Sequence, residues 1–228
     1  VSEPVFAVVS GAYGSHYGPV RDFCEADAVP CILPNLEFAP PEADNDFHTI
    51  YYSRGVGLEA DLVAHDLKET TDSGTVVAVY RDDDVGALAA LRLSQQLRGS
   101  RLQVRLQPIP AGATAAALHT ALERTPKEAT LALWLRPKDL AELPGAPRGT
   151  VYVSGVMGQY ETAPVPAQWR PATKLVFNVS LSEERRVRLD YAHGWFRVRK
   201  IPEIAFREQA DTMLACGILA ETVKHVID

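Results

Sequence analysis

Short continuous apolar runs alternate along the chain with longer stretches in which apolar residues recur every three or four positions. The runs at 5–9 (VFAVV), 75–80 (TVVAVY) and 129–135 (ATLALWL) are typical of strands covered on both faces of a parallel sheet. The stretches between them, such as 86–97, have the spacing of amphipathic helices. The pattern therefore predicts an α/β fold built from β–α–β units.

The same pattern gives bounds for the expected elements. We expect strands at 5–9, 31–33, 47–52, 75–80, 102–106, 129–135, 151–153 and 174–180, and helices at 18–27, 56–68, 86–97, 114–124, 136–143 and 205–226. Residues 34–46 are predicted to be loop, and residues 188–202 mix charged and aromatic side chains without a clear period. The last helix is predicted to bury Leu214 and its neighbours, and Cys216 with them.

Composition and charge narrow the class of protein. The 228 residues are 46% apolar, enough for a full core, and the net charge of −6 argues against a nucleic-acid partner. No apolar run approaches the ~20 residues that span a bilayer. The six histidines form no HxH or HExxH pattern, so we expect no metal site and no cofactor.

The three cysteines leave two interpretations open. Cys24 and Cys31 lie seven positions apart across a predicted helix-to-strand junction, where a disulfide is geometrically feasible and would suit an oxidising compartment. Two small buried apolar residues are the equally weighted alternative. There is no CxxC pair and no haem-attachment motif.

Polar and aromatic residues follow the predicted strands, at the edge where open α/β sheets bind ligands. The candidate ligand-binding residues are Gly14, Ser15, His16, Tyr17, Asn35, Tyr52, Ser53, Arg54, Arg81, Trp134, Arg136, Met157 and Gln159. Structural roles compete for several of them: Asn35 suits a turn, and Trp134 suits the core. No catalytic set stands out, because SGAYGS is neither GxSxG nor a P-loop and Ser15 beside His16 is not a triad.

Four segments carry a resemblance to a known family. They are VVSGAYGSHYGPVRDFCEADAVPCILPN (8–35), FHTIYYSRGVGLEADLVAHDL (47–67), GTVVAVYRDDDVGALAALRLSQQLRG (74–99) and EQADTMLACGILAETVKHV (208–226). In their order and spacing they resemble the type I periplasmic solute-binding proteins of ABC transporters, the branched-chain amino-acid-binding family. The resemblance implies two doubly wound parallel-sheet lobes joined by crossover strands, residues 1–72 with 181–228 and residues 73–180. The first lobe is apparently shortened, which would expose a sheet edge that a homodimer could pair.

The resemblance also implies a function and a location. It describes a periplasmic or extracytoplasmic solute-binding component that is not an enzyme, closes its interlobe cleft on a small polar ligand and works with an ABC transporter permease. Val85 replaces the family's aromatic residue, and no acid stands near Met157 to hold an α-amino group, so a standard amino acid is not the expected ligand. The alternatives are an α/β enzyme domain that binds a nucleotide or sugar at SGAYGS, and a sensory or accessory domain of the same fold.

Overall fold

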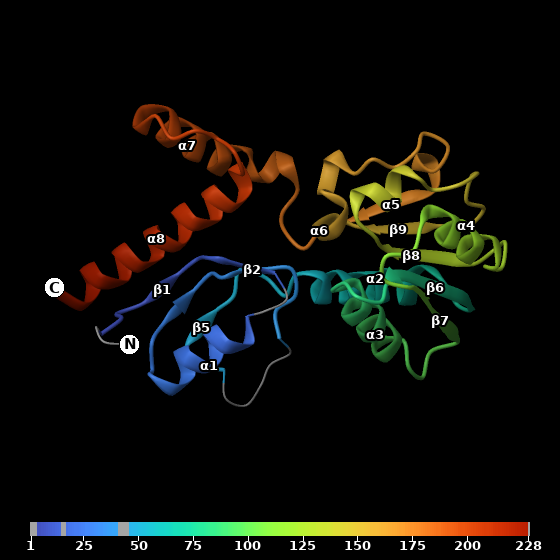
Figure 1. Ribbon diagram of the computed structural model, residues 1–228, viewed down its shortest axis with the longest axis horizontal. Helices are drawn as coiled ribbons and strands as arrows, with labels where there is room; N and C mark the ends of the chain where they lie inside the picture. The colour runs from blue at the N-terminus through green and yellow to red at the C-terminus, as the bar shows by residue number, and fades with distance from the viewer. Residues whose placement is uncertain (1–3, 15–16, 41–45, 228) are drawn as a thin grey trace. The chain divides into compact units, whose positions relative to one another are not determined.

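The chain folds into two compact units. The computed structural model describes residues 4–14, 17–40 and 46–227 (Figure 1). Unit 1 comprises Val1–Ser53 and Val179–Asp228, and unit 2 comprises Arg54–Asn178. Each unit contains its own parallel sheet with helices packed against it.

Unit 1 is built on short parallel strands. One sheet has the order β1-β3-β5, and a second pairs β2 with β4. The strands are β1 (Val8–Val9), β2 (Ala12–Gly14), β3 (Cys31–Ile32), β4 (Asn35–Leu36) and β5 (Thr49–Ile50). The first strand is shorter than the apolar run predicts, and Val5 and Phe6, predicted to be buried, are 38% and 72% exposed. The predicted loops also contain pairing that the sequence does not signal, since Gly14 pairs with Leu36.

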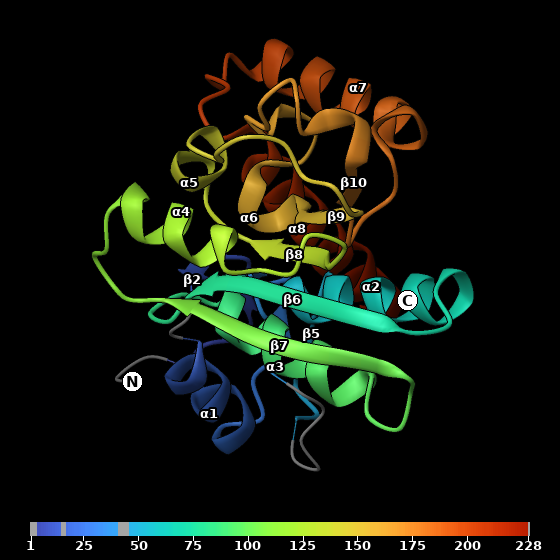
Figure 2. The same cartoon turned by 90° about the vertical axis from the view of Figure 1, so that its right-hand side faces the viewer.

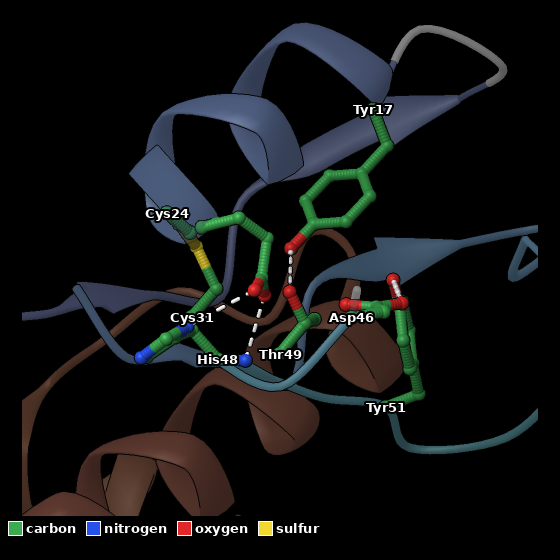
Figure 3. Close-up of a disulfide and its surroundings, with 8 residues drawn as sticks. Tyr17, Cys24, Cys31, Asp46, His48, Thr49 and Tyr51 are labelled. Atoms are coloured by element: carbon green, nitrogen blue, oxygen red, sulfur yellow. Dashed lines mark hydrogen bonds and ion pairs between the residues drawn. A yellow bond between two sulfur atoms is a disulfide. The ribbon is translucent and has the colours of Figure 1, made fainter. Parts of the chain in front are cut away.

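Helix α1 (Gly18–Ala26) is joined to the sheet by a disulfide (Figure 3). Cys24 on the helix and Cys31 on β3 are bonded, with their Cα atoms 6.3 Å apart. Beside this bond, the Glu25 carboxylate accepts the His48 backbone N–H at 2.7 Å and contacts its Nδ1 at 3.0 Å. Of the two interpretations open from the sequence, the structure has the disulfide, and both half-cystines are buried.

Two helices near the C-terminal end of the chain complete unit 1. Helix α8 (Phe206–Ile227) runs beside β1, and Ala215 packs fully buried on Ile32 and Leu33. The prediction for the buried face of this helix is wrong in part, because Leu214 is 46% exposed and Cys216 is exposed. Helix α7 (Ser182–Arg199) occupies most of the stretch for which the sequence showed no clear period.

Unit 2 is a five-stranded parallel sheet in the order β10-β9-β8-β6-β7 (Figure 2). Helices α2 and α3 cover one face, and α4 with α5 covers the other, where Leu118 and Leu140 pack on Val77 and Val79. The strands are β6 (Gly74–Arg81), β7 (Leu102–Ile109), β8 (Thr130–Trp134), β9 (Val151–Ser154) and β10 (Thr173–Val176). The helices are α2 (Val56–Thr70), α3 (Gly86–Gln96), α4 (Ala115–Glu123), α5 (Pro137–Ala141) and the short α6 (Gly155–Gly158), followed by single 3-10 turns at Tyr160–Thr162 and Arg170–Ala172.

The boundary between the units differs from the one expected at residues 72 and 73. Helix α2 belongs to unit 2, where it packs along α3 and its Asp61 forms a bidentate ion pair with Arg92. Asp66, also on α2, accepts hydrogen bonds from Lys174 Nζ at 2.7 Å and from Tyr152. The expected boundary at residues 72 and 73 falls in the turn between α2 and β6.

Candidate functional site

A hydrogen-bonded polar cluster lies where the strands of unit 1 end. Ser10 follows β1 in a left-handed conformation (φ 57°) and is 3% exposed. Its Oγ lies 2.8 Å from Thr212 Oγ1 on α8, and Asn35 Nδ2 donates to it at 3.2 Å. The Asn35 backbone N–H donates to the Gly11 carbonyl at 2.9 Å. A non-glycine residue held in this backbone region is strained, and such strain is concentrated at functional sites.

This cluster forms part of the polar wall of a groove within unit 1. The groove has a volume of about 1460 Å³, and Ser10, Gly11, Asn35 and Tyr52 contribute to its wall. Most of the remaining wall comes from the apolar sides of α7 and α8. Asp211 on α8 also lines it, and burial raises the pKa of this carboxyl although Arg207 and Arg185 oppose the shift. The groove thus combines hydrogen-bonding groups, the Asp211 carboxyl among them, with an apolar surface, as small-molecule sites commonly do.

The candidate residues of unit 1 have different positions. Asn35 and Tyr52 line the groove. Tyr17 does not, because it is 4% exposed and its hydroxyl lies 3.0 Å from Thr49 Oγ1, which corrects the expectation of ligand contact (Figure 3). Gly14 is the last residue of β2, and Ser53 is the last residue of the unit's first segment. Ser15 and His16 lie outside the described residues.

Unit 2 carries two ion pairs at the carboxyl edge of its sheet. Arg81, at the end of β6, binds Asp139 through two hydrogen bonds of 2.8 and 2.7 Å. Arg136, after β8, binds Asp84 through two hydrogen bonds of 2.7 Å each. The neighbouring strands β6 and β8 form the point where the strand order reverses, the usual ligand position of open α/β sheets. Burial alone would raise the pKa of Asp84, but its bonds to Arg136 lower that pKa below its ordinary value.

The other candidates of unit 2 are mainly structural. Trp134 and Met157 are 2% and 1% exposed, so the structure supports the core interpretation of Trp134 and corrects the expectation of ligand contact for Met157. Trp134 Nε1 is nevertheless buried without a hydrogen-bond partner among the described residues. Gln159 is exposed, in a left-handed conformation (φ 71°), and its carbonyl accepts from Thr162 Oγ1. Arg54 is exposed at the start of the unit.

Comparison with solved structures identifies the fold. No protein-family model matches the sequence, and no curated protein matches it. A fatty acid ABC transporter substrate-binding protein from Thermomonospora curvata superposes with a TM-score of 0.64 at 14% identity, over 93% of this chain and 58% of that one. The chain has the fold of the type I periplasmic binding proteins.

Two further matches agree on this binding-protein fold. One is an extracellular ligand-binding receptor from Rhodopseudomonas palustris HaA2, with a TM-score of 0.57 at 12% identity over 91% of this chain and 62% of that one. The other is an ABC transporter substrate-binding protein from Desulfitobacterium hafniense in complex with Leu, with a TM-score of 0.57 at 13% identity over 92% of this chain and 62% of that one. The predicted fold class is confirmed. The chain spans about three fifths of the length of these proteins.

Several residues of this binding-protein fold were not among the sequence candidates. Ser10 is the first residue of the SGAYGS loop, whereas the candidate residues Gly14 and Ser15 are its last two. Thr212 is distant in sequence, and nothing near it signals a contact with Ser10. Glu59 is fully buried in unit 2, where it accepts hydrogen bonds from Ser154 Oγ at 2.5 Å and the Val156 N–H at 2.9 Å. A lone acid on a predicted helix gives no indication of such burial.

The described part of the chain contains neither a metal-binding cluster nor a membrane-spanning helix. Within residues 4–14, 17–40 and 46–227, no group of three or more His, Cys, Asp or Glu side chains is placed to hold a metal ion. Over the same residues, no helix is both long enough and apolar enough to cross a bilayer.

Proposed function

We propose that the chain is the solute-binding component of an ABC-type transport system and that it binds a small organic ligand. The observation that carries the proposal is the polar cluster of Ser10, Asn35 and Thr212 at the carboxyl edge of unit 1, in a chain with the fold of periplasmic binding proteins. The ligand-bound form would be recognised by a transporter permease outside the cytoplasm. The proposal draws on proteins of similar fold whose names describe transport or ligand binding.

The side chains at the carboxyl edges of the sheets of unit 1 and unit 2 favour a ligand other than a free amino acid. An α-amino group in a desolvated site needs an acidic or carbonyl partner. At the switch point of unit 2, the carboxylates Asp84 and Asp139 are each bound by an arginine of the same unit. The proposed ligand is therefore an organic molecule that hydrogen-bonds to Asn35 and Ser10 and is not held by the paired carboxylates of unit 2.

Thermal unfolding and isothermal titration with a panel of amino acids, amides, small carboxylates, alcohols and aromatic acids test this proposal. A ligand present at about 100 times its Kd should stabilise the chain by roughly 2.7 kcal/mol. Asn35→Ala should weaken binding by roughly tenfold, because one hydrogen-bonding side chain is lost. Gln95→Ala, which removes an exposed amide on α3, is the matched control and should bind as the wild type does.

Two results would count against the proposal. One is a folded chain that no compound of the panel stabilises, which would favour an accessory domain of the same fold. The other is turnover of a bound compound, which would favour an enzyme. Equal affinity of the Asn35 and Gln95 variants would place the binding site away from the polar cluster.

A further inference from the structure

A small pocket lies at the amino edge of the unit 2 sheet and is called the amino-edge pocket below. It has a volume of about 340 Å³, and its wall comes from residues 122–131, which lead into β8, residues 144–149, which lead into β9, and Trp169. Its floor is apolar, because Ala129, Leu131 and Trp169 are buried. The pocket is therefore at the opposite end of these strands from the carboxyl edge, and it is separate from the polar cluster of unit 1.

The loop between α5 and β9 is fixed at both ends of the amino-edge pocket. At its start, Trp169 Nε1 donates to the Pro144 carbonyl at 3.2 Å and to the Gly145 carbonyl at 3.0 Å. At its end, a Cβ on Gly149 would lie 2.4 Å from the Ala129 carbonyl oxygen, so this close approach requires glycine. The pocket is therefore preformed, which lowers the entropic cost of binding a ligand there.

Two cationic side chains line the amino-edge pocket from different segments. Lys127 lies in the turn before β8 and Arg148 in the loop before β9, and both are exposed. Within the described part of the chain, neither side chain has a hydrogen-bond or ion-pair partner. Glu123 is the one lining acid, and the exposed Arg124 and Glu128 lie next to the lining residues in sequence with opposite charges. The lining is therefore net positive in a chain whose net charge is −6.

The loop before β9 also offers backbone hydrogen-bond donors. The N–H groups of Gly145, Ala146 and Arg148 have no hydrogen-bond partner within the described part of the chain. Gly145 is in a left-handed conformation (φ 56°). Successive N–H groups around a left-handed residue commonly form an anion-binding concavity. Side chains and backbone therefore favour the same ligand, an anion with several acceptor oxygens.

We propose that the amino-edge pocket binds a small phosphate monoester, with the phosphoryl group at Lys127, Arg148 and the loop N–H groups and the esterified apolar group on the floor. A phosphoryl group carries a charge of about −1.5 to −2 at pH 7 and three acceptor oxygens, so it remains attracted to two cations despite Glu123. Arginine can bind two of these oxygens at once, and lysine acts as a point charge. This second ligand site goes beyond the site proposed for unit 1 and does not depend on it.

The test titrates the full chain with phenyl phosphate, inorganic phosphate and phenol at neutral pH and constant ionic strength, followed by isothermal titration. Phenyl phosphate should bind more tightly than inorganic phosphate, and phenol should not bind measurably. Arg148→Gln should weaken phenyl phosphate binding by about tenfold, because a charge-assisted hydrogen bond is lost, whereas Glu123→Gln should strengthen it. Arg105→Gln is the matched control, because Arg105 is an exposed arginine on β7 of the same unit, and it should bind as the wild type does.

Each contrary result has a distinct meaning. Failure of the folded chain to bind phenyl phosphate, or equal affinity of the Arg148 and Arg105 variants, would overturn the proposal. Weaker binding by Glu123→Gln would contradict its electrostatic basis, and equal affinity for inorganic phosphate would overturn the assignment of a monoester. Phenyl phosphate binding that Asn35→Ala weakens and Arg148→Gln does not would place the ligand in unit 1 instead. The panel that tests the proposed function contains no phosphate, so either proposal can fail while the other stands.

Discussion

Reduction of the Cys24–Cys31 disulfide should destabilise unit 1 and leave unit 2 unchanged. The cross-link joins residues seven positions apart, for which the chain-entropy relation gives about 2.4 kcal/mol at 25 °C. The half-cystines are 0% and 1% exposed, so the reduced thiols would remain as small buried apolar groups with their packing retained. The entropy of the unfolded chain is therefore the main contribution that reduction removes. All three cysteines belong to unit 1, which makes unit 2 an internal control.

Hydrogen exchange read by mass spectrometry measures this change separately in each unit. The experiment compares oxidised and reduced chain in a Cys216→Ser background, which excludes thiol–disulfide interchange with the exposed thiol. For 2.4 kcal/mol, the most protected amides of α1 should exchange about fiftyfold faster after reduction, because 1.36 kcal/mol corresponds to a factor of ten. The amides of α3 in unit 2 should exchange at the same rate in both samples.

Two results would refute the reasoning. Unchanged exchange in α1 would mean that the disulfide does not restrict the unfolded ensemble of unit 1. An equal acceleration in α3 would mean that the two units unfold as one cooperative body, in which case the destabilisation could not be assigned to α1 and β3. An acceleration of amide exchange much larger than fiftyfold, confined to unit 1, would show that reduction also disrupts the packing of α1 on the sheet.

Three further predictions concern the ion pairs of unit 2. Arg81→Met should destabilise the unit by about 3 kcal/mol in urea unfolding, because it leaves the 6%-exposed Asp139 side chain without its guanidinium partner. Lys174→Met, which breaks a pair with Asp66 whose side chains are 50% and 39% exposed, should cost less than about 1 kcal/mol, and an equal loss in both variants would contradict the role of burial. Hydrogen bonding from Lys174 lowers the pKa of Asp66, and the bonds from Arg136 outweigh burial and lower the pKa of Asp84. Both carboxylates therefore stabilise the folded chain above their unfolded pKa of about 4. This stability is lost as the pH falls through their lower folded pKa values. Urea unfolding at a series of pH values should show this loss, and Asp84→Asn should make the dependence less steep, whereas parallel curves would exclude its contribution.

The elements that the sequence predicted well are those whose pattern is local. The bounds of helices α2 and α3 match the predicted 56–68 and 86–97 closely, although Leu62, Leu88 and Leu91 on them are exposed. Helix α7 was missed since its apolar residues point in two directions. Ala192 and Phe196 are buried, whereas Val187 and Tyr191 are exposed. Two apolar faces on one helix remove the single stripe by which a helix is recognised.

The site was harder to predict because its partners are far apart in the sequence. Asn35 and Tyr52 could be selected, since residues that follow parallel strands come to one edge of a sheet. The environment of Asn35 could not be predicted, because Ser10 and Thr212, which form the cluster with it, are separated by 202 positions. Arg81 likewise carries no sign of its partner, because Asp139 lies 58 residues away. The positions of strand ends can be predicted from the local sequence, but whether a charged side chain there has an ion-pair partner depends on tertiary contacts.

The same distinction bears on the ligand. From the sequence, Arg81 and Arg136, the arginines after β6 and β8, are candidate ligand-binding residues. In the structure each of them binds an aspartate of its own unit through two short hydrogen bonds, so an anionic ligand would have to displace a partner already held at close range. Unit 1, considered by itself, offers Ser10 and Asn35 beside an apolar wall. Both observations favour a ligand recognised by hydrogen bonds and apolar contact, and both would be contradicted if a small carboxylate of the panel bound most tightly.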